Sequence, residues 1–234
     1  MSSYIEVKNV SKSFGGKAIL QDVSLSIEQG TAVGLVGANG VGKSTLLRIL
    51  VGLNTGFQGD VMVNNIPIEK KNLKTIRKNV GYVFQDADSQ LFMSTVFDDV
   101  AFAPRNYGMS EAEVNEKTME ALKVVHIEQL KDKQIYKLSG GEKKLASIAT
   151  ILSTEPDVIL MDEPSVALDP KNRRNLINIL NQLNQAKIIA SHDLNMIMDT
   201  CERTILLSDG KVIKDGNTKE ILLDKELMEE SGLE

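Results

Sequence analysis

Residues 31–53 read TAVGLVGANGVGKSTLLRILVGL and join three kinds of local structure in one short stretch. The first seven residues form an apolar run that predicts a buried strand, and the leucines that follow at helical spacing predict a helix. Glycines in the turn between them would allow backbone N–H groups to curl around a phosphate. The turn matches the pattern of a glycine, any four residues and then Gly-Lys-Ser, at Gly37, Gly42, Lys43 and Ser44.

A strand, this loop and a helix, in that order, are the context in which the pattern acts as a P-loop, which binds nucleoside triphosphates. Lys43 would reach the β- and γ-phosphate oxygens and stabilise charge on the transferred group, and the Ser44 hydroxyl would be a ligand of Mg²⁺. We expect the nucleotide to contact Gly37, Asn39, Gly40, Gly42, Lys43, Ser44 and Thr45.

A second apolar strand ends in two acids, because residues 158–163 read VILMDE. Asp162 would hold Mg²⁺, directly or through water, and Glu163 would polarise the attacking water as general base. His192 follows another apolar strand, at the sheet edge where folds of this kind place their ligands. We expect His192 to contact the γ-phosphate and to hold Glu163 and the water in line.

Strand patterns occupy the two ends of the chain, and helical patterns occupy its middle. Residues 5–10 and 23–30 alternate apolar and polar side chains, which predicts strands near the N-terminus. In the middle, Ser110 and Glu113 form a capping box that predicts the start of a helix. After Pro156, strands alternate with helices, the last of which is expected near 218–230, and that order is typical of a parallel sheet.

These patterns predict one α/β domain of the P-loop NTPase (RecA-like) class, spanning residues 1–234. Its parallel sheet core would have an N-terminal antiparallel β subdomain and an inserted α-helical subdomain. We expect the catalytic core to use about residues 1–85 and 155–234, and the helical subdomain about residues 86–154.

The composition narrows the class of protein. Hydrophobic residues make up 42% of the chain, which is enough for a packed core, and the net charge of −5 argues against a nucleic-acid-binding surface. The single cysteine, Cys201, fits a reducing compartment. No stretch approaches the roughly 18 continuous apolar residues of a membrane span, and we expect no signal peptide at MSSYIEVKNV. Any role at a membrane would therefore depend on a partner.

A second potential phosphate cradle lies about a hundred residues after the first, at 138–142, LSGGE. A serine and two glycines before a helix leave open N–H groups for an anion. The stretch resembles the signature motif of ABC ATPases, and the order of the other motifs matches that family over about residues 4–216. The resemblance implies two ATPase subunits, alike or closely related, packed head to tail. Each ATP would lie between the P-loop of one subunit and Ser139, Gly140 and Gly141 of the other.

Further site residues are implied by the same resemblance. Phe14, in SKSFGG, matches the aromatic residue that stacks on adenine. Gln85, in YVFQDA, matches the glutamine that touches Mg²⁺ or the attacking water and links the sheet to the helical subdomain. Residues 167–169, ALD, match a loop that crosses the dimer interface. The implied activity is ATP hydrolysis that opens and closes the dimer, with ATP and Mg²⁺ required.

The stretch FQDADSQLF, at 84–92, resembles the corresponding segment of the energy-coupling factor and cobalt/nickel importer ATPases. In that group Gln90, Leu91 and Phe92 would lie on a short helix that faces the groove for the transmembrane subunits. The alternative is that the Leu-Phe pair belongs to the core of the insert. The resemblance implies import of a vitamin or a transition-metal ion, with this subunit peripheral on the cytoplasmic face of the cell membrane.

Two other classes compete with a transporter subunit. A soluble ABC ATPase of translation or DNA repair usually has two such domains in one chain or a long coiled-coil insertion, and this sequence has neither feature. A GTPase should have an NKxD motif that reads the base, and a small-molecule kinase would leave LSGGE unexplained. The sequence lacks NKxD.

Overall fold

A computed structural model describes residues 3–233. Within them a six-stranded sheet has the strand order β10-β9-β3-β8-β7-β6, in which β10 pairs antiparallel to its neighbour and the other five strands are parallel. The bounds of these strands are β3 (Ala32–Val36), β6 (Val80–Val83), β7 (Val158–Asp162), β8 (Ala186–Ala190), β9 (Arg203–Ser208) and β10 (Lys211–Asn217).

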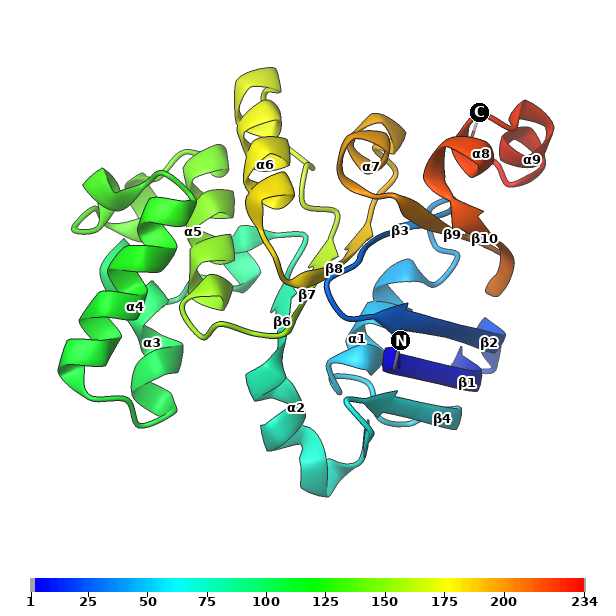
Figure 1. The fold of residues 1–234 in the computed structure, drawn as a ribbon, viewed down its shortest axis with the longest axis horizontal. Helices are drawn as coiled ribbons and strands as arrows, with labels where there is room; N and C mark the ends of the chain where they lie inside the picture. The colour runs from blue at the N-terminus through cyan, green and yellow to red at the C-terminus, as the bar shows by residue number, and fades with distance from the viewer. Residues whose placement is uncertain (1–2, 234) are drawn as a thin grey trace.

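A second, antiparallel sheet has the order β2-β1-β4-β5 and packs beside the parallel sheet (Figure 1). Helix α1 (Lys43–Leu50) lies between the two sheets and contacts β2, β7 and β8. This packing fixes the position of the loop before α1, which carries the P-loop pattern. The strands are β1 (Ser3–Phe14), β2 (Lys17–Glu28), β4 (Gln58–Val63) and β5 (Ile66–Pro67).

Strand β7 is apolar at four successive positions because both of its faces are buried. Val158 and Leu160 belong to the core shared with α1 and the antiparallel sheet. Ile159 and Met161 belong to the core on the other face, which continues into the helical part of the chain. A strand covered on both faces reads as a continuous apolar run rather than as an alternating one. Its last residue, Asp162, lies at the carboxyl end of this buried strand.

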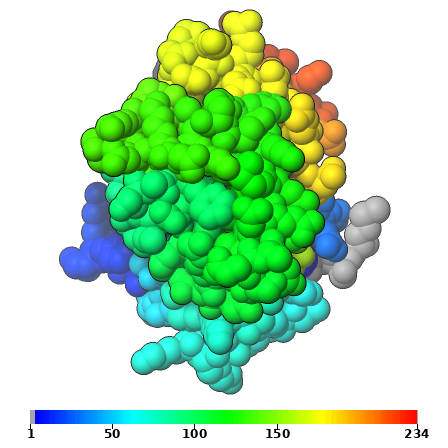
Figure 2. Space-filling model, turned by 90° about the vertical axis from the view of Figure 1, so that its left-hand side faces the viewer, coloured from blue at the N-terminus to red at the C-terminus, as the bar shows by residue number. Residues whose placement is uncertain are grey.

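Helices α3, α4 and α5 group together on one side of the sheets and form the face shown mainly in green in Figure 2 (Figures 1 and 2). Helix α4 begins after Ser110, whose capping box with Glu113 is present as predicted. The α/β fold class with its helical insert is confirmed, whereas the boundaries near residues 85 and 155 stay a prediction. The bounds are α3 (Val96–Asn106), α4 (Glu111–Val124) and α5 (Gly140–Leu152), with 3₁₀ turns η2 (Ala87–Ser89), η3 (Glu128–Leu130) and η4 (Ile135–Lys137).

The C-terminal segment differs from the sequence-based expectation of one helix near 218–230. It forms two short helices, because the backbone of Asp224 is extended and its side chain caps a new N-terminus by accepting a hydrogen bond from the N–H of Leu227. No helix within residues 3–233 is long and apolar enough to cross a membrane. The remaining helices are η1 (Lys70–Asn72), α2 (Leu73–Asn79), α6 (Pro170–Gln182), α7 (Leu194–Thr200), α8 (Thr218–Leu222) and α9 (Lys225–Glu230).

Candidate active site

The loop from residue 37 to 42 joins β3 to α1 and depends on its glycines. Gly37 and Gly42 have φ angles of 151° and 112°, in the region that only glycine adopts without strain. A Cβ atom on Gly37 would overlap the backbone carbonyl oxygen of Leu207. The backbone therefore approaches its neighbours too closely for any larger residue. Asn39 and Gly40 are exposed on this loop, and Ser44 and Thr45 are half-buried in the first turn of α1.

Lys43 folds back over the loop that precedes it. Its side chain is buried, and Nζ donates hydrogen bonds to the carbonyl oxygens of Gly37 at 2.6 Å and Ala38 at 3.2 Å. Burial lowers the pKa of Lys43, and the negative charges of Glu163 and Asp162 oppose that shift. The ammonium group thus lies at the centre of the loop, close to two carboxylates.

Asp162 joins the end of β7 to α1. Ser44 Oγ donates to Asp162 Oδ1 at 2.8 Å, and the Tyr82 hydroxyl donates to Asp162 Oδ2 at 3.0 Å. Burial and the charge of Asp162 raise the pKa of Tyr82, so its hydroxyl keeps its proton at neutral pH. A hydroxyl and a carboxylate oxygen side by side form the all-oxygen donor set that Mg²⁺ prefers, so these residues fit the predicted ion.

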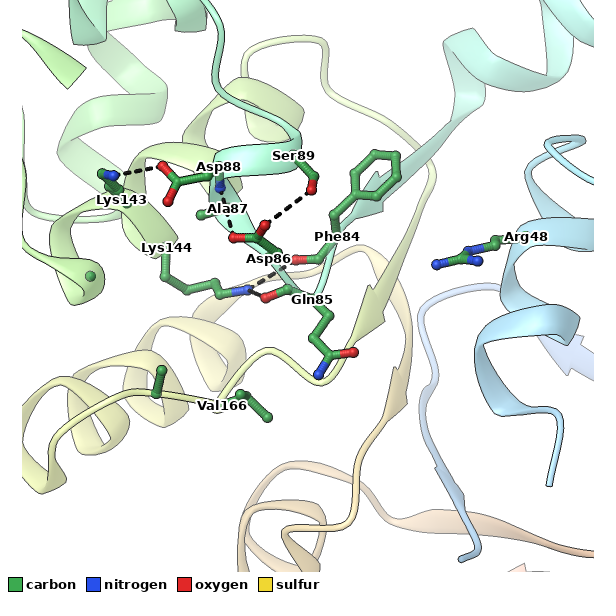
Figure 3. Close-up of a pocket in the computed structure, with 12 residues that line it drawn as sticks. Arg48, Phe84, Gln85, Asp86, Ala87, Asp88, Ser89, Lys143, Lys144 and Val166 are labelled. Carbon is green, nitrogen blue, oxygen red and sulfur yellow. Dashed lines mark hydrogen bonds and ion pairs between the residues drawn. The ribbon is translucent and has the colours of Figure 1, made fainter. Parts of the chain in front are cut away.

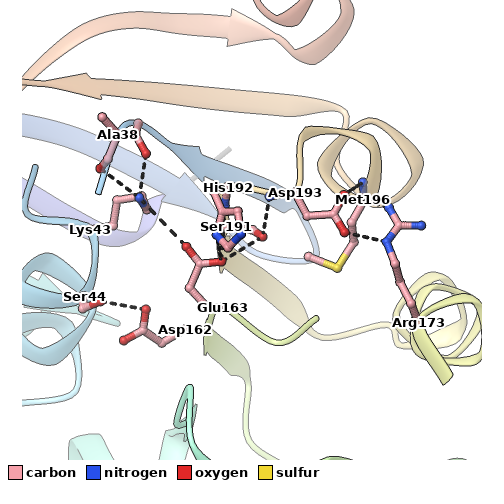
Figure 4. Close-up of polar contacts among 11 residues, drawn as sticks. Ala38, Lys43, Ser44, Asp162, Glu163, Arg173, Ser191, His192, Asp193 and Met196 are labelled. Atoms are coloured by element: carbon pink, nitrogen blue, oxygen red, sulfur yellow. Dashed lines mark hydrogen bonds and ion pairs between the residues drawn. The ribbon is translucent and has the colours of Figure 1, made fainter. Parts of the chain in front are cut away.

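Glu163 has an unusual backbone and several side-chain partners (Figure 4). Its φ angle is 47°, and its N–H donates to Ala190 O at 2.8 Å. Glu163 Oε2 lies 2.8 Å from His192 Nδ1 and accepts a 3.2 Å hydrogen bond from Ser191 Oγ, while Oε1 lies 4.0 Å from Lys43 Nζ. Left-handed backbone at a residue other than glycine persists where the surroundings impose it, often at functional sites.

Lys43, Ser44, Asp162, Glu163 and His192 therefore meet as the sequence predicted, at the carboxyl ends of parallel strands. Strand β8 supplies the turn that carries His192, whose side chain is 56% exposed. The Glu163 side chain beside it is only 8% exposed. A nearly buried carboxylate thus lies next to an accessible imidazole.

Gln85 lies on an exposed segment after β6. Its backbone carbonyl accepts a hydrogen bond from Lys144 Nζ at 2.7 Å, and the carbonyl of Phe84 accepts a second one at 2.9 Å (Figure 3). No side-chain hydrogen bond joins Gln85 to another of the described residues. Lys144, on α5, is buried, and burial lowers its pKa to about 8.

The short helix predicted to carry Gln90, Leu91 and Phe92 does not include them, and their role in docking stays a prediction. The Gln90 side chain accepts from the Phe84 N–H at 3.1 Å and donates to Ser147 O at 2.7 Å, so it joins the segment to α5. Leu91 is buried in the core of the helical part. The short helix η2 ends before these residues. Phe92 alone is exposed, at 65%.

The second cradle lies at the start of α5. Ser139 caps the helix in a capping box with Glu142, and both Ser139 and Gly140 are exposed. Gly141 is buried, and a Cβ there would lie 2.5 Å from Asn172 Nδ2. Among the described residues, the hydrogen bonds of Ser139 stay within α5 and do not reach the P-loop.

Phe14, the residue expected to stack on adenine, lies at the end of β1. Its side chain is 49% exposed, with Lys12 Nζ 4.8 Å from its ring centroid.

Three polar contacts near the site were absent from the sequence analysis. Ser191 holds the Glu163 carboxylate, and Tyr82 holds Asp162. Arg173, on the helix after residues 167–169, forms a bidentate pair with Asp193 at 2.5 and 2.7 Å, which fixes the turn after His192. From its residue type and its place before a helix, Asp193 could be recognised in the sequence as a helix cap. No local pattern indicates that its partner is Arg173 on α6.

Comparison with known proteins places these features in one family. Residues 20–166 match the family model described as ABC transporter. A putative ABC transporter ATP-binding protein of Geobacter sulfurreducens is 45% identical over 98% of this chain and 93% of its own length. An energy-coupling factor transporter ATP-binding protein, EcfA, of Carboxydothermus hydrogenoformans is 39% identical over 100% of this chain and 87% of its own length.

Solved structures agree. CbiO1 from Clostridium perfringens, described as part of the ABC transporter complex CbiONQ, has a TM-score of 0.88 and 33% identity, covering 100% of this chain and 96% of that one. The ATP-binding cassette MJ0796, solved as a dimer in a post-hydrolysis state with ADP and phosphate, has a TM-score of 0.82 and 30% identity, covering 92% and 98%. The chain therefore belongs to the ABC transporter family, as an ATP-binding subunit that hydrolyses ATP, and it is related to the energy-coupling factor ATPases.

Proposed function

We propose that this subunit powers the import of a vitamin or a transition-metal ion, by closing with a second ATPase subunit around two ATP molecules. The relation to EcfA and to CbiO1 of the CbiONQ complex supports the import branch. The second subunit is another copy or a close relative. Both would lie on the cytoplasmic face of the membrane, bound to transmembrane subunits.

The observation that carries the dimer is the exposure of the second cradle. Ser139 and Gly140 present the N-terminus of α5 to solvent, and no hydrogen bond among the described residues joins them to the loop around Lys43. A helix N-terminus with free N–H groups suits an anion such as the γ-phosphate. Because its own P-loop site is built elsewhere, the cradle would act on the ATP of the partner subunit, and the solved dimer of MJ0796 with ADP and phosphate supports a paired arrangement.

Within one site, the described residues divide the work of phosphoryl transfer. Lys43 would leave the carbonyls of its own loop for the β- and γ-phosphate oxygens, and Phe14 would stack on the adenine. Glu163 would take the proton of the attacking water, and His192 would keep that carboxylate and the water in line. Ser44, Asp162 and Gln85 would hold Mg²⁺, whose charge would offset that of the phosphates.

A physical link connects the ATP site to the helical part. Lys144 holds the backbone carbonyls of Phe84 and Gln85, and Gln90 ties the same segment to Ser147. Lys143, also on α5, pairs with Asp88 at 2.6 Å (Figure 3). If α5 shifts when Ser139 and Gly140 bind a phosphate, the segment that carries Gln85 would therefore move with it. The same shift would be passed to a partner bound beside that segment.

The surface for such a partner is an aromatic patch, defined here as Phe92, Phe102 and Tyr136. These residues are 65%, 38% and 73% exposed, and the rings of Phe92 and Phe102 pack edge to face at 4.7 Å. Phe92 and Tyr136 also line one surface hollow, together with Leu91 and Ile135. Exposed aromatic residues around a hollow are typical of the centre of a protein interface. We infer that an apolar helix of the transmembrane subunit binds there.

Replacing Phe92 by Glu should separate the ATPase from its membrane partner. The Phe92 side chain is mostly exposed, so the change should cost the fold only about 0.5–1.5 kcal/mol, mainly from the lost aromatic pair. A charge at the centre of an apolar contact should abolish co-purification of the transmembrane subunits from detergent-solubilised membranes. The ATPase rate of the isolated subunit should stay within about twofold of wild type.

Leu223→Glu is the matched control, because Leu223 is 70% exposed and follows α8, which lies on the opposite side of the molecule from α3 to α5 (Figure 1). It should leave the complex intact. Equal recovery of the membrane subunits with Phe92→Glu would contradict the docking surface.

The import branch is tested on the wild-type complex in liposomes that enclose ATP, so that only complexes with their ATPase subunits inside are driven. ATP-dependent accumulation of a vitamin, Co²⁺ or Ni²⁺ in the lumen supports import, and ATP-dependent extrusion overturns it.

A further inference from the structure

The two carboxylate oxygens of Asp162 have different partners on different elements. Oδ1 accepts from Ser44 Oγ at 2.8 Å, on the side of the P-loop. Oδ2 accepts from the Tyr82 hydroxyl at 3.0 Å, on the side of β6. Asp162 is 2% exposed and Tyr82 is 5% exposed, so water does not compete for these bonds. Each oxygen is therefore held in one direction.

Tyr82 is itself fixed in place by the sheet. Its backbone pairs with Leu160 in the parallel register of β6 and β7, two residues before Asp162. Its ring packs edge to face against Phe84, with centroids 4.7 Å apart and an interplanar angle of 84°. Phe84 precedes Gln85, the proposed ligand in the segment that follows this strand. The hydroxyl of Tyr82 thus reaches Asp162 from a rigid position between two parts of the proposed metal site.

We propose that Tyr82 is a positioning residue for the Mg²⁺ site: its hydroxyl keeps Asp162 Oδ2 turned toward β6, so that Oδ1 stays turned toward Ser44. This inference rests on the proposed function of Ser44 and Asp162. Without Tyr82 the carboxylate can rotate about its Cβ–Cγ bond, and the buried Oδ2 loses its donor. Hydrogen bonds to a metal ligand of this kind change metal affinity or activity by about 10- to 100-fold when they are removed.

The variant Tyr82→Phe removes the hydroxyl and keeps the ring that packs on Phe84. Its ATP affinity is measured by calorimetry over a series of free Mg²⁺ concentrations and in EDTA. We expect the Mg²⁺ concentration that gives half of the full gain in ATP affinity to rise about 10-fold. The affinity in EDTA should change by less than about twofold, since Tyr82 contacts the metal ligand and not the P-loop. The Mg²⁺ dependence of hydrolysis should shift in parallel.

Tyr4→Phe is the matched control. Tyr4 is also buried, and its hydroxyl donates to Asp157 Oδ2 at 2.5 Å. Asp157 precedes β7, so this pair lies at the opposite end of the strand from Asp162. Both variants remove one tyrosine–aspartate hydrogen bond, and thermal unfolding reports the cost to the fold of each. The control should show the Mg²⁺ dependence of wild type.

A wild-type Mg²⁺ dependence in Tyr82→Phe would overturn the proposal and leave Tyr82 a structural residue. An equal loss of ATP affinity in EDTA and in Mg²⁺ would also overturn it, because the residue would then shape the nucleotide pocket rather than the metal site. Failure of the proposed function itself would look different. In that case wild-type protein would bind ATP equally well with and without Mg²⁺.

Discussion

Glu163→Gln should lower the rate of ATP hydrolysis about 100- to 10,000-fold, the contribution typical of a positioned general base. Glutamine has nearly the same shape, so the contacts with Ser191 and His192 need not be rebuilt, but it cannot take a proton from water. ATP affinity should remain within about threefold of wild type, because the base acts in the transition state. Phosphate release in single-turnover experiments, with ATP binding measured separately, checks both expectations.

Glu155→Gln is a close control for this change. Glu155 also has a left-handed backbone, with φ of 48°, and also pairs with a lysine, Lys117, at 2.8 Å. It lies before β7 and far along the strand from Glu163. Its replacement should leave hydrolysis within about twofold of wild type. Hydrolysis at the wild-type rate in Glu163→Gln would assign the base to another residue.

Lys43→Ala should weaken ATP binding about 10- to 100-fold, since a hydrogen bond to a charged group is worth about 1.5–3 kcal/mol. The free protein already places the ammonium group over the loop, where it contacts the carbonyls of Gly37 and Ala38. Removing it deletes the positive charge closest to the expected phosphates. Calorimetry with ATP gives the affinity, and thermal unfolding shows whether the fold is retained.

Lys187→Ala tests whether any buried lysine would have the same effect. Like Lys43, Lys187 is buried and donates to two backbone carbonyls, those of Leu183 and Gln185, and burial lowers its pKa. It lies at the start of β8, whereas the P-loop lies at the ends of the strands. ATP affinity should be unchanged in this variant. Wild-type ATP affinity in Lys43→Ala would contradict the role of the P-loop lysine.

The main features of the fold could be predicted because they depend on patterns along the chain. The apolar run that ends at Asp162 indicated a strand, and the structure buries both faces of that strand. The capping box at Ser110 indicated the start of α4. The single helix expected near 218–230 is divided into α8 and α9. Asp224, which caps α9, is the residue whose type could have indicated the break. A weak cap inside an otherwise helical pattern is not enough, from sequence alone, to divide a helix.

The parts of the site that could not be predicted depend on contacts between distant segments. Gln90 is a polar residue of a type usually found at the surface, yet its side chain forms hydrogen bonds with Phe84 and with α5. In the Leu-Phe pair that follows, the sequence does not say which of two neighbouring apolar residues points inward. Tyr82 lies inside a buried strand, where a tyrosine reads as one more core residue. Its role depends on the partner across the sheet.

The central claim is that each ATP is held between two subunits. Gly140 allows a direct test, because a Cβ there would meet no other described residue within 4 Å apart from its chain neighbours and the nearby backbone of its own helix, so a side chain should fit the free subunit. An aspartate in the first turn of α5 also suits the helix dipole, by about 0.3–1 kcal/mol. In a dimer, however, that carboxylate would lie against the phosphates of the partner's ATP.

The decisive measurement is the molar mass, by light scattering, of the single variant Glu163→Gln and of the double variant Glu163→Gln with Gly140→Asp. Each variant is measured with and without ATP. The single variant should be a dimer with ATP and a monomer without it. The double variant should still bind ATP at the P-loop but should stay a monomer. A dimer of the double variant that is as stable as that of the single variant, or a single variant that stays monomeric with ATP bound, would contradict a site shared between two copies of this subunit.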